Sequence, residues 1–128
     1  MTSPPAATPT GLTIVVATAD GERFRTALMM ALAQIALGGT ARLFLQEGAV
    51  ALLLPDEVAE DAARYAAAGL PARAAIFADA LDAGVAITAC QSGLALIGAT
   101  ADRFDPRIEW GGMIGLLQSL DQDRLVVI

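Results

Sequence analysis

The sequence lacks histidine and lysine altogether, and it has a single cysteine, Cys90. Without histidine, the chain has neither the commonest general base nor the commonest metal ligand, and no Cys–His or Ser–His pair can form. Without lysine, it can form no Schiff base and no lysine-dependent phosphate loop. One cysteine excludes a disulfide within the chain and a thiolate-rich zinc site. We therefore expect no metal and no organic cofactor, and Cys90 is the only plausible nucleophile.

Basic charge and long apolar runs are also scarce. Eight arginines, scattered along the chain, are outnumbered by fourteen acidic residues, and the net charge is −6. Nucleic-acid binders normally have a basic patch, so we expect no nucleic-acid partner. Hydrophobic residues make up 55% of the chain. However, no apolar run reaches the roughly 20 residues that a spanning helix needs, so we expect no membrane partner.

The first residues, MTSPPAATPTG, contain no basic residue and no apolar stretch. They do not have the form of a secretory signal, and they predict a flexible tail over residues 1–11. Residues 12–128 then form one domain, since neither a linker nor an internal repeat interrupts them. Without a targeting segment, and with a single cysteine, the expected location is the cytoplasm.

Strand-like and helical patterns alternate along this domain. Short apolar or β-branched runs predict five strands, at residues 12–17, 41–46, 85–89, 107–110 and 124–128. Helical spacing predicts helices over residues 22–37, 56–68, 72–83, 91–97 and 113–120. Residues 48–54 fit either a short strand or a turn of buried helix. This alternation predicts an α/β fold with a mainly parallel sheet and helices on both faces.

Ligands of open α/β sheets lie beyond the carboxyl ends of the strands, and Cys90 follows one such end. The unpaired N–H groups and the dipole of the helix that begins there favour an anion, which for a cysteine is the thiolate. Gln91 and Ser92 form the first turn of that helix, and we expect them to donate to the sulfur. The alternative is a small buried core residue, which is the usual fate of a lone cysteine.

A second candidate loop, containing Thr18, Asp20 and Gly21, follows the first strand. It precedes a helix and could contribute to binding there. It lacks a GxGxxG motif, and Asp20 would repel an anion, so a dinucleotide site is not expected. Asp20 is also a good helix N-cap. The pair Asp102 and Asp105 could serve as catalytic carboxylates, although turn residues of this kind are common.

Three stretches together resemble a known family: ITACQSGLALIGATAD, EWGGMIGLLQSL and the closing RLVVI. With the N-terminal unit LTIVVATADGERFRTALMMALAQIALGGTARLFLQEG, they resemble the DsrE/DsrF-like sulfur-relay superfamily. The resemblance implies a three-layer α/β/α fold with a five-stranded parallel sheet. It also implies homo-oligomeric rings, usually trimers or hexamers, and a persulfide-carrying cysteine at the position of Cys90.

Three functions remain open at this stage. The first is sulfur handling, in which Cys90 takes sulfur from a donor protein or small thiol and passes it to an acceptor. The second is a non-catalytic, ring-forming protein that binds a small molecule or a partner, with Cys90 only packing. The third is a small hydrolase or nucleotide-binding enzyme that uses carboxylates. Self-association is expected independently, because a monomer with so few charges would expose unusually large apolar patches.

Overall fold

The computed structural model describes residues 10–55 and 61–128 of the chain. The predicted tail, apart from its last two residues, and the start of the helix predicted over residues 56–68 lie outside the described residues. In the remainder, every predicted strand is present, with ends that shift by one or two residues. The strands are β1 (Gly11–Val16), β2 (Thr40–Leu45), β3 (Ala86–Cys90), β4 (Glu109–Gly111) and β5 (Arg124–Val127).

Within the described residues all four strand pairings are parallel, and the strand order is β4-β3-β2-β1-β5. The α-helices between them are α1 (Gly21–Ala36), α2 (Ala62–Ala67), α3 (Arg73–Asp82), α4 (Gln91–Ile97) and α5 (Met113–Gln118). Two 3₁₀ helices, η1 (Glu47–Leu53) and η2 (Ala101–Arg103), complete the described elements. Residues 48–54, which the sequence left open between strand and helix, are thus helical. The helices predicted over residues 91–97 and 113–120 are confirmed as the short helices α4 and α5.

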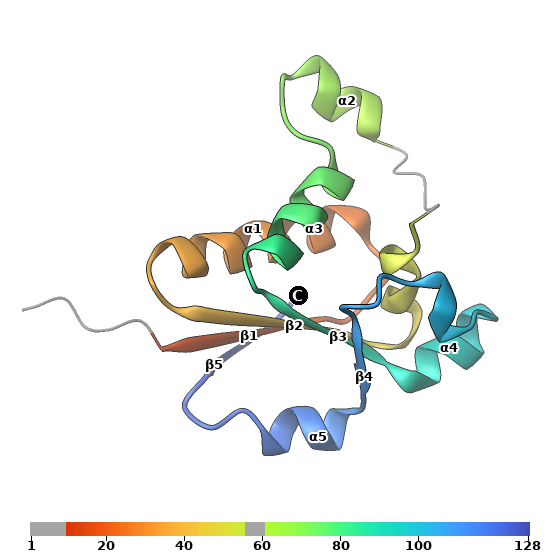
Figure 1. Cartoon of the computed structure of the whole chain (residues 1–128). Coiled ribbons are helices and arrows are strands. Elements are labelled where there is room, and N and C mark those ends of the chain that lie inside the picture. The colour runs from red at the N-terminus through yellow and green to blue at the C-terminus, as the bar shows by residue number, and fades with distance from the viewer. Residues whose placement is uncertain (1–9, 56–60) are drawn as a thin grey trace, which may run out of the picture.

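The elements form three layers (Figure 1). Helices α1 and α3 cover one face of the sheet and α5 covers the other, while α4 lies beside the β3 end. The chain moves in one direction through β1, β2, β3 and β4, and then returns to the far edge to form β5. Because parallel crossovers are right-handed, this reversal places α5 on the face opposite α1.

Helix α1 is the main buried helix. Asp20 caps it, since its carboxylate accepts a hydrogen bond from the Arg23 backbone N–H at 3.0 Å. Phe24, Leu28 and Ala31 lie on its inner face and are buried, as their helical spacing predicts. They pack against β1 and β2, whose central side chains are almost completely inaccessible, so this layer forms the core of the domain.

A partly buried polar network joins the α5 side to the sheet. Arg42, on β2, donates from Nε to Thr13 Oγ1 at 3.0 Å and from Nη1 to Ser119 Oγ at 2.7 Å. Thr13 in turn donates to Asp123 Oδ2 at 2.7 Å. Arg42 also forms an ion pair with Asp123, with 3.3 Å between Nε and Oδ2. These bonds join β1, β2 and the segment that connects α5 to β5.

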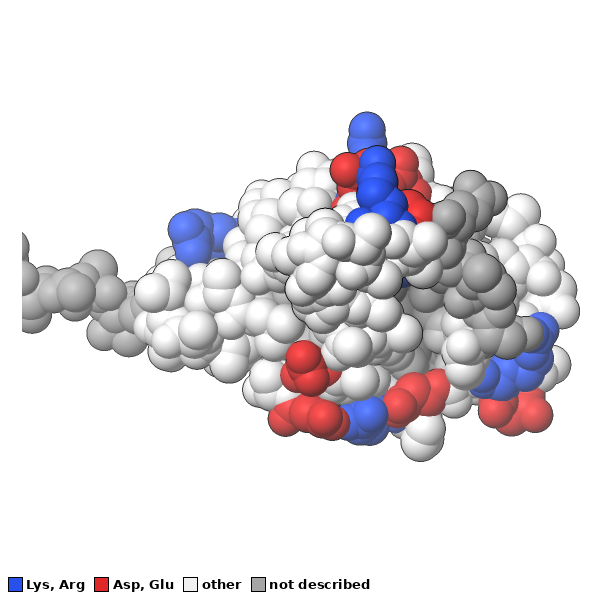
Figure 2. Space-filling model, turned by 90° about the horizontal axis from the view of Figure 1, so that it is seen from above, with Lys and Arg blue, Asp and Glu red and all other residues white. Residues whose placement is uncertain are grey.

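Charge is sparse on the upper face of the molecule. Acidic and basic side chains gather there in small groups near the margins, and most of the visible surface is uncharged (Figure 2). No helix within residues 10–55 and 61–128 is both long and apolar enough to cross a membrane.

Candidate functional site

Cys90 is the last residue of β3 and the N-cap of α4, as the sequence predicts. Its backbone is still extended, with φ −67° and ψ 125°, so the chain turns into the helix directly after it. The side chain lies at the carboxyl edge of the sheet, where Sγ is 2.9 Å from Ser92 Oγ. The residue is 7% exposed. The thiol is therefore held at the margin of the core, with a small part of the residue accessible.

The segment after β2 supplies a second contact to this thiol. Leu45 of β2 pairs with Ala89 of β3, so the next residues along the two strands, Gln46 and Cys90, are neighbours. Glu47 then adopts a left-handed conformation, with φ 42°, and begins η1. This conformation is uncommon for a residue other than glycine. It turns the chain toward α4 and places the backbone of Glu47 within hydrogen-bonding distance of the Cys90 thiol.

Gly93 makes this close approach possible. A Cβ atom at Gly93 would lie 2.6 Å from the carbonyl oxygen of Glu47 and 2.5 Å from Val50 Cγ2. Both distances are far below van der Waals contact, so a larger residue would push η1 away from α4. Glycine inside a helix is unfavourable by itself, and its presence here is explained by this packing.

These contacts determine the acidity of Cys90. Burial raises its pKa, but hydrogen bonds lower it: one from the Ser92 side chain and others from the backbones of Glu47, Ser92 and Gly93. The hydrogen bonds together outweigh burial, and the pKa lies below the ordinary value of a cysteine. Such a shift favours the thiolate, which is the nucleophilic form. Donors from two separate elements, η1 and α4, thus converge on one sulfur atom.

The sequence alone did not identify Gln46, Glu47 or Gly93 as part of this site. Glu47 acts through its backbone, which no side-chain motif reveals. Gln46 Oε1 is buried and has no hydrogen-bond partner among the described residues, while its Nε2 donates to Glu47 Oε1 at 3.2 Å. The one available signal was the glycine three residues after the cysteine, since an isolated glycine in a helical pattern often marks close packing.

The other predicted site residues lie in two places. Gln91 is exposed at the first position of α4, beside Cys90. Thr18 and Asp20 are exposed in the loop after β1, and Gly21 begins α1. That loop lies at the same edge of the sheet, but β2 separates its strand from β3. Among the residues predicted from sequence, the structure therefore places Ser92 in direct contact with Cys90.

The carboxylates that could have served a hydrolase have structural partners. Asp105 binds the Arg107 guanidinium, with 3.0 Å between Oδ2 and Nη2, and these hydrogen bonds lower its pKa. Asp102 accepts a hydrogen bond from the Thr100 hydroxyl. Both residues therefore serve the loop around η2, as turn residues commonly do. In the part of the chain that the structure describes, no group of three or more acidic or cysteine side chains is placed to hold a metal ion.

Comparisons with known proteins agree with this fold. The model of the DsrE/DsrF-like family matches residues 11–128. The solved structure of the ychN protein from E. coli is 15% identical, with a TM-score of 0.70, and the alignment covers 93% of this chain and 99% of that one. Protein BT1422 from Bacteroides thetaiotaomicron, of unknown function, is 20% identical with a TM-score of 0.64, covering 98% and 100% of the two chains.

A third solved structure, MTH1491 from Methanobacterium thermoautotrophicum, is also of unknown function. It is 12% identical, with a TM-score of 0.64 and coverage of 93% and 99%. No curated protein sequence matches the chain significantly. At these identities the structural matches establish a shared fold, and the match to the family model establishes that the chain is related to this family.

Proposed function

The chain belongs to the DsrE/DsrF-like family, and on that premise we propose that it handles sulfur through Cys90, as a persulfide carrier. One observation supports this assignment above the others. The Cys90 thiol is placed where Ser92 Oγ, 2.9 Å away, and the backbones of two elements can stabilise its anion. A structural cysteine needs no such donors, since a thiol packs well among apolar side chains.

The proposed reaction is an exchange between thiols and persulfides. The Cys90 thiolate attacks the outer sulfur of a donor persulfide, the donor S–S bond breaks, and the donor leaves as a thiolate. Cys90 then holds the transferred sulfur as a persulfide. An acceptor thiolate attacks that terminal sulfur and releases the Cys90 thiolate. The sulfane sulfur moves without a net oxidation or reduction, and no cofactor is required.

The lowered pKa favours both halves of this cycle. A larger thiolate fraction at neutral pH speeds the first attack, and a more acidic thiol is a better leaving group in the second. The hydrogen bonds from Ser92 and Glu47 thus stabilise the same anion before sulfur arrives and after it leaves. With 7% of Cys90 exposed, the donor and acceptor must be small thiols or extended protein segments.

We further propose that the chain forms homo-oligomers, with the α5 side of the sheet as the contact surface. This side has five exposed, large apolar side chains, on α5 and β5: Met113, Ile114, Leu117, Leu125 and Val127. Leu125 pairs in register with Thr13, so their side chains point to the same face of the sheet. That face is the α5 face, because Arg42 bonds both Thr13 and Ser119, and Ser119 directly follows α5. The β5 side chains therefore share the α5 face, and monomers rarely leave so many apolar groups together in water.

Sulfur transfer is tested by incubating the folded protein with glutathione persulfide and measuring the mass of the intact chain by mass spectrometry. We expect a gain of one sulfur atom, removed again by an added thiol, and no gain in Cys90→Ser. The chain has one cysteine, so the signal has one source. A Cys90 thiol that reacts only after unfolding would reject the carrier function. It would favour the second function, a binding protein in which Cys90 belongs to the core.

A further inference from the structure

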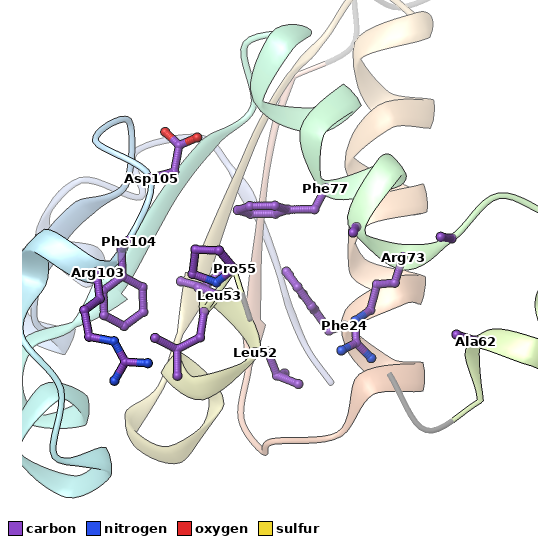
Figure 3. A pocket seen from close by; sticks show the side chains of 13 residues that line it. Phe24, Leu52, Leu53, Pro55, Ala62, Arg73, Phe77, Arg103, Phe104 and Asp105 are labelled. Atoms are coloured by element: carbon purple, nitrogen blue, oxygen red, sulfur yellow. The ribbon is translucent and has the colours of Figure 1, made fainter. Parts of the chain in front are cut away.

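Apart from Cys90, a cavity of about 540 Å³ lies between α1, η1, α3 and η2 (Figure 3). Two arginines, Arg73 and Arg103, are part of its lining, and both already have interaction partners, so their charges do not call for a ligand. Among the described residues, the buried side-chain atom that lacks a hydrogen-bond partner is Gln46 Oε1. This oxygen belongs to the neighbourhood of Cys90.

Gln46 and Cys90 lie side by side on one face of the sheet. Phe44 of β2 pairs in register with Thr88 of β3. Gln46 and Cys90 follow these residues by two positions, so their side chains point to the same face. The Gln46 N–H still bonds Val16 O at 3.0 Å, and the backbones of Gln46 and Cys90 are extended, so the alternation continues this far. Neighbouring strands are about 4.8 Å apart, which places the two side chains next to each other.

The orientation of the Gln46 amide is fixed by its neighbour. Nε2 donates to Glu47 Oε1 at 3.2 Å. Turning the amide over would set two oxygen atoms against each other, so Oε1 is the atom that remains buried and unpartnered. On the other side of Cys90, β4 places Gly111 in register with it. Because Gly111 has no side chain, Gln46 is the strand neighbour that brings a polar group to this face beside the sulfur.

The resting thiol of Cys90 does not use this oxygen. The sulfur has hydrogen bonds with Ser92 and with the backbones of Glu47 and Gly93, whereas Gln46 Oε1 has none. A persulfide at Cys90 extends the side chain by one S–S bond of about 2 Å. The outer sulfur can therefore reach an acceptor that the thiol leaves free.

We propose that Gln46 Oε1 accepts a hydrogen bond from the outer S–H of the Cys90 persulfide and keeps that sulfur protonated for delivery. This role rests on the proposed carrier function. An acceptor thiolate attacks the outer sulfur, the S–S bond breaks, and its electron pair passes to Sγ, which leaves as the thiolate. The proton stays on the outer sulfur, so the acceptor departs as a persulfide and nothing is oxidised or reduced overall.

Donors and acceptor then match the two sulfur atoms of the persulfide. The inner sulfur gains negative charge as the S–S bond breaks, and the donors from Ser92 and Glu47 stabilise that charge. The outer sulfur must stay neutral, because a persulfide anion would carry its charge on the atom under attack and repel the incoming thiolate. Gln46 supplies the acceptor that favours the neutral form.

The test separates sulfur uptake from sulfur delivery. Each protein is loaded with glutathione persulfide, freed of the reagent and mixed with excess glutathione at neutral pH, and the extra sulfur is followed by intact mass. Gln46→Leu should take up sulfur at the wild-type rate but deliver it about fivefold more slowly, because one hydrogen bond is lost. Gln91→Leu is the matched control, since Gln91 is exposed next to Cys90 on α4 and should deliver as the wild type does.

The near-ultraviolet absorbance of the persulfide anion reports its protonation directly. Gln46→Leu should raise the ratio of anion to acid about fivefold at a given pH, since the acceptor for the S–H is gone. Gln46→Glu, whose carboxylate is a stronger acceptor, should lower that ratio. A purely structural disturbance would shift the ratio in the same direction in both variants, and that result would count against the proposal.

The outcomes distinguish this role from the carrier function itself. Normal uptake, with equal delivery rates and equal absorbance profiles in the wild type and Gln46→Leu, would overturn the role of Gln46 and leave the carrier function intact. Slower uptake together with slower delivery would also overturn it, because Gln46 would then act on the thiol. A folded wild type that takes up no sulfur would reject the carrier function, and this role with it.

Discussion

The carbonyl oxygen of Glu47 faces Gly93 so closely that a methyl group on Gly93 would lie 2.6 Å from it. This contact joins η1 to α4 and thereby holds the Glu47 backbone beside Cys90. Gly93→Ala should displace η1, raise the pKa of Cys90 and destabilise the fold by about 1–3 kcal/mol, as overpacked core positions usually do. Urea denaturation and the pH dependence of Cys90 alkylation measure the two effects.

Gly115 provides the control for that substitution, because a Cβ atom there would meet nothing within 4 Å. Gly115→Ala removes backbone freedom from the unfolded chain and should leave stability unchanged or raise it by up to about 1 kcal/mol. A Gly93→Ala protein as stable as the wild type, with unchanged Cys90 reactivity, would show that Glu47 is not positioned in this way.

The hydroxyl of Ser92 should control the reactivity of Cys90 directly. Ser92→Ala removes the side-chain donor 2.9 Å from Sγ, so the pKa of Cys90 should rise. Alkylation by iodoacetamide at neutral pH should slow by about fivefold, since a hydrogen bond to a charged group is lost. Ser92→Thr keeps the hydroxyl and should restore the rate. Equal alkylation rates for the wild type and both variants would show that Ser92 does not control the reactivity of Cys90.

The lowered pKa of Cys90 also predicts how stability depends on pH. Below both the folded and the unfolded pKa, the thiol is protonated in either state, and bonds to the thiolate contribute nothing. As pH rises past the folded pKa, the native state releases its proton while the unfolded state still holds one, so stability rises. The gain should be complete above the ordinary cysteine pKa of about 8.5.

Chemical denaturation of wild type and Cys90→Ala across this pH range gives the measurement. The wild type should gain stability relative to the variant as pH increases, and lose that gain as pH falls through the folded pKa. Parallel pH profiles for the two proteins would mean that the thiolate is not stabilised in the native state.

Arg42 should be a principal support of the α5 layer. Its guanidinium bonds Thr13, Ser119 and Asp123, and its side chain is only 28% exposed. Arg42→Met should cost about 2 kcal/mol, because it leaves partly buried polar partners unsatisfied. Arg64→Met is the control: Arg64 pairs with Asp61, its side chain is 68% exposed, and the expected loss is below about 0.5 kcal/mol. If urea denaturation showed that the two variants lose similar amounts of stability, the prediction would be contradicted.

Self-association should depend on the exposed apolar side chains of α5. Ile114 is 77% exposed in the single chain, so Ile114→Glu should not disturb folding but should oppose contact with a second copy. Size-exclusion chromatography with light scattering should give a trimer or hexamer for the wild type and a smaller species for the variant. Leu37→Glu, at the exposed end of α1, is the control. A monomeric wild type would refute the assembly.

Local patterns in the sequence were sufficient for much of this architecture. The apolar run after Gly11 and the helical spacing of Phe24, Leu28 and Ala31 specify a buried strand and a one-sided helix, because each pattern depends only on neighbouring residues. The strand-to-helix junction at Cys90, and its contact with Ser92 two residues later, are local in the same sense. The lack of histidine and lysine limited the chemistry before any fold was considered.

The contacts between distant segments were decided by the tertiary structure alone. Glu47 and Cys90 are far apart in the chain, and they meet because β2 and β3 are adjacent and Glu47 takes a left-handed conformation. Arg73 and Arg103 line one cavity because the start of α3 and η2 lie near the same edge of the sheet. Hydrogen bonds from backbone donors, and contacts between segments far apart in the chain, produce no periodic pattern in a sequence. They depend on strand order and packing, which only the folded chain sets.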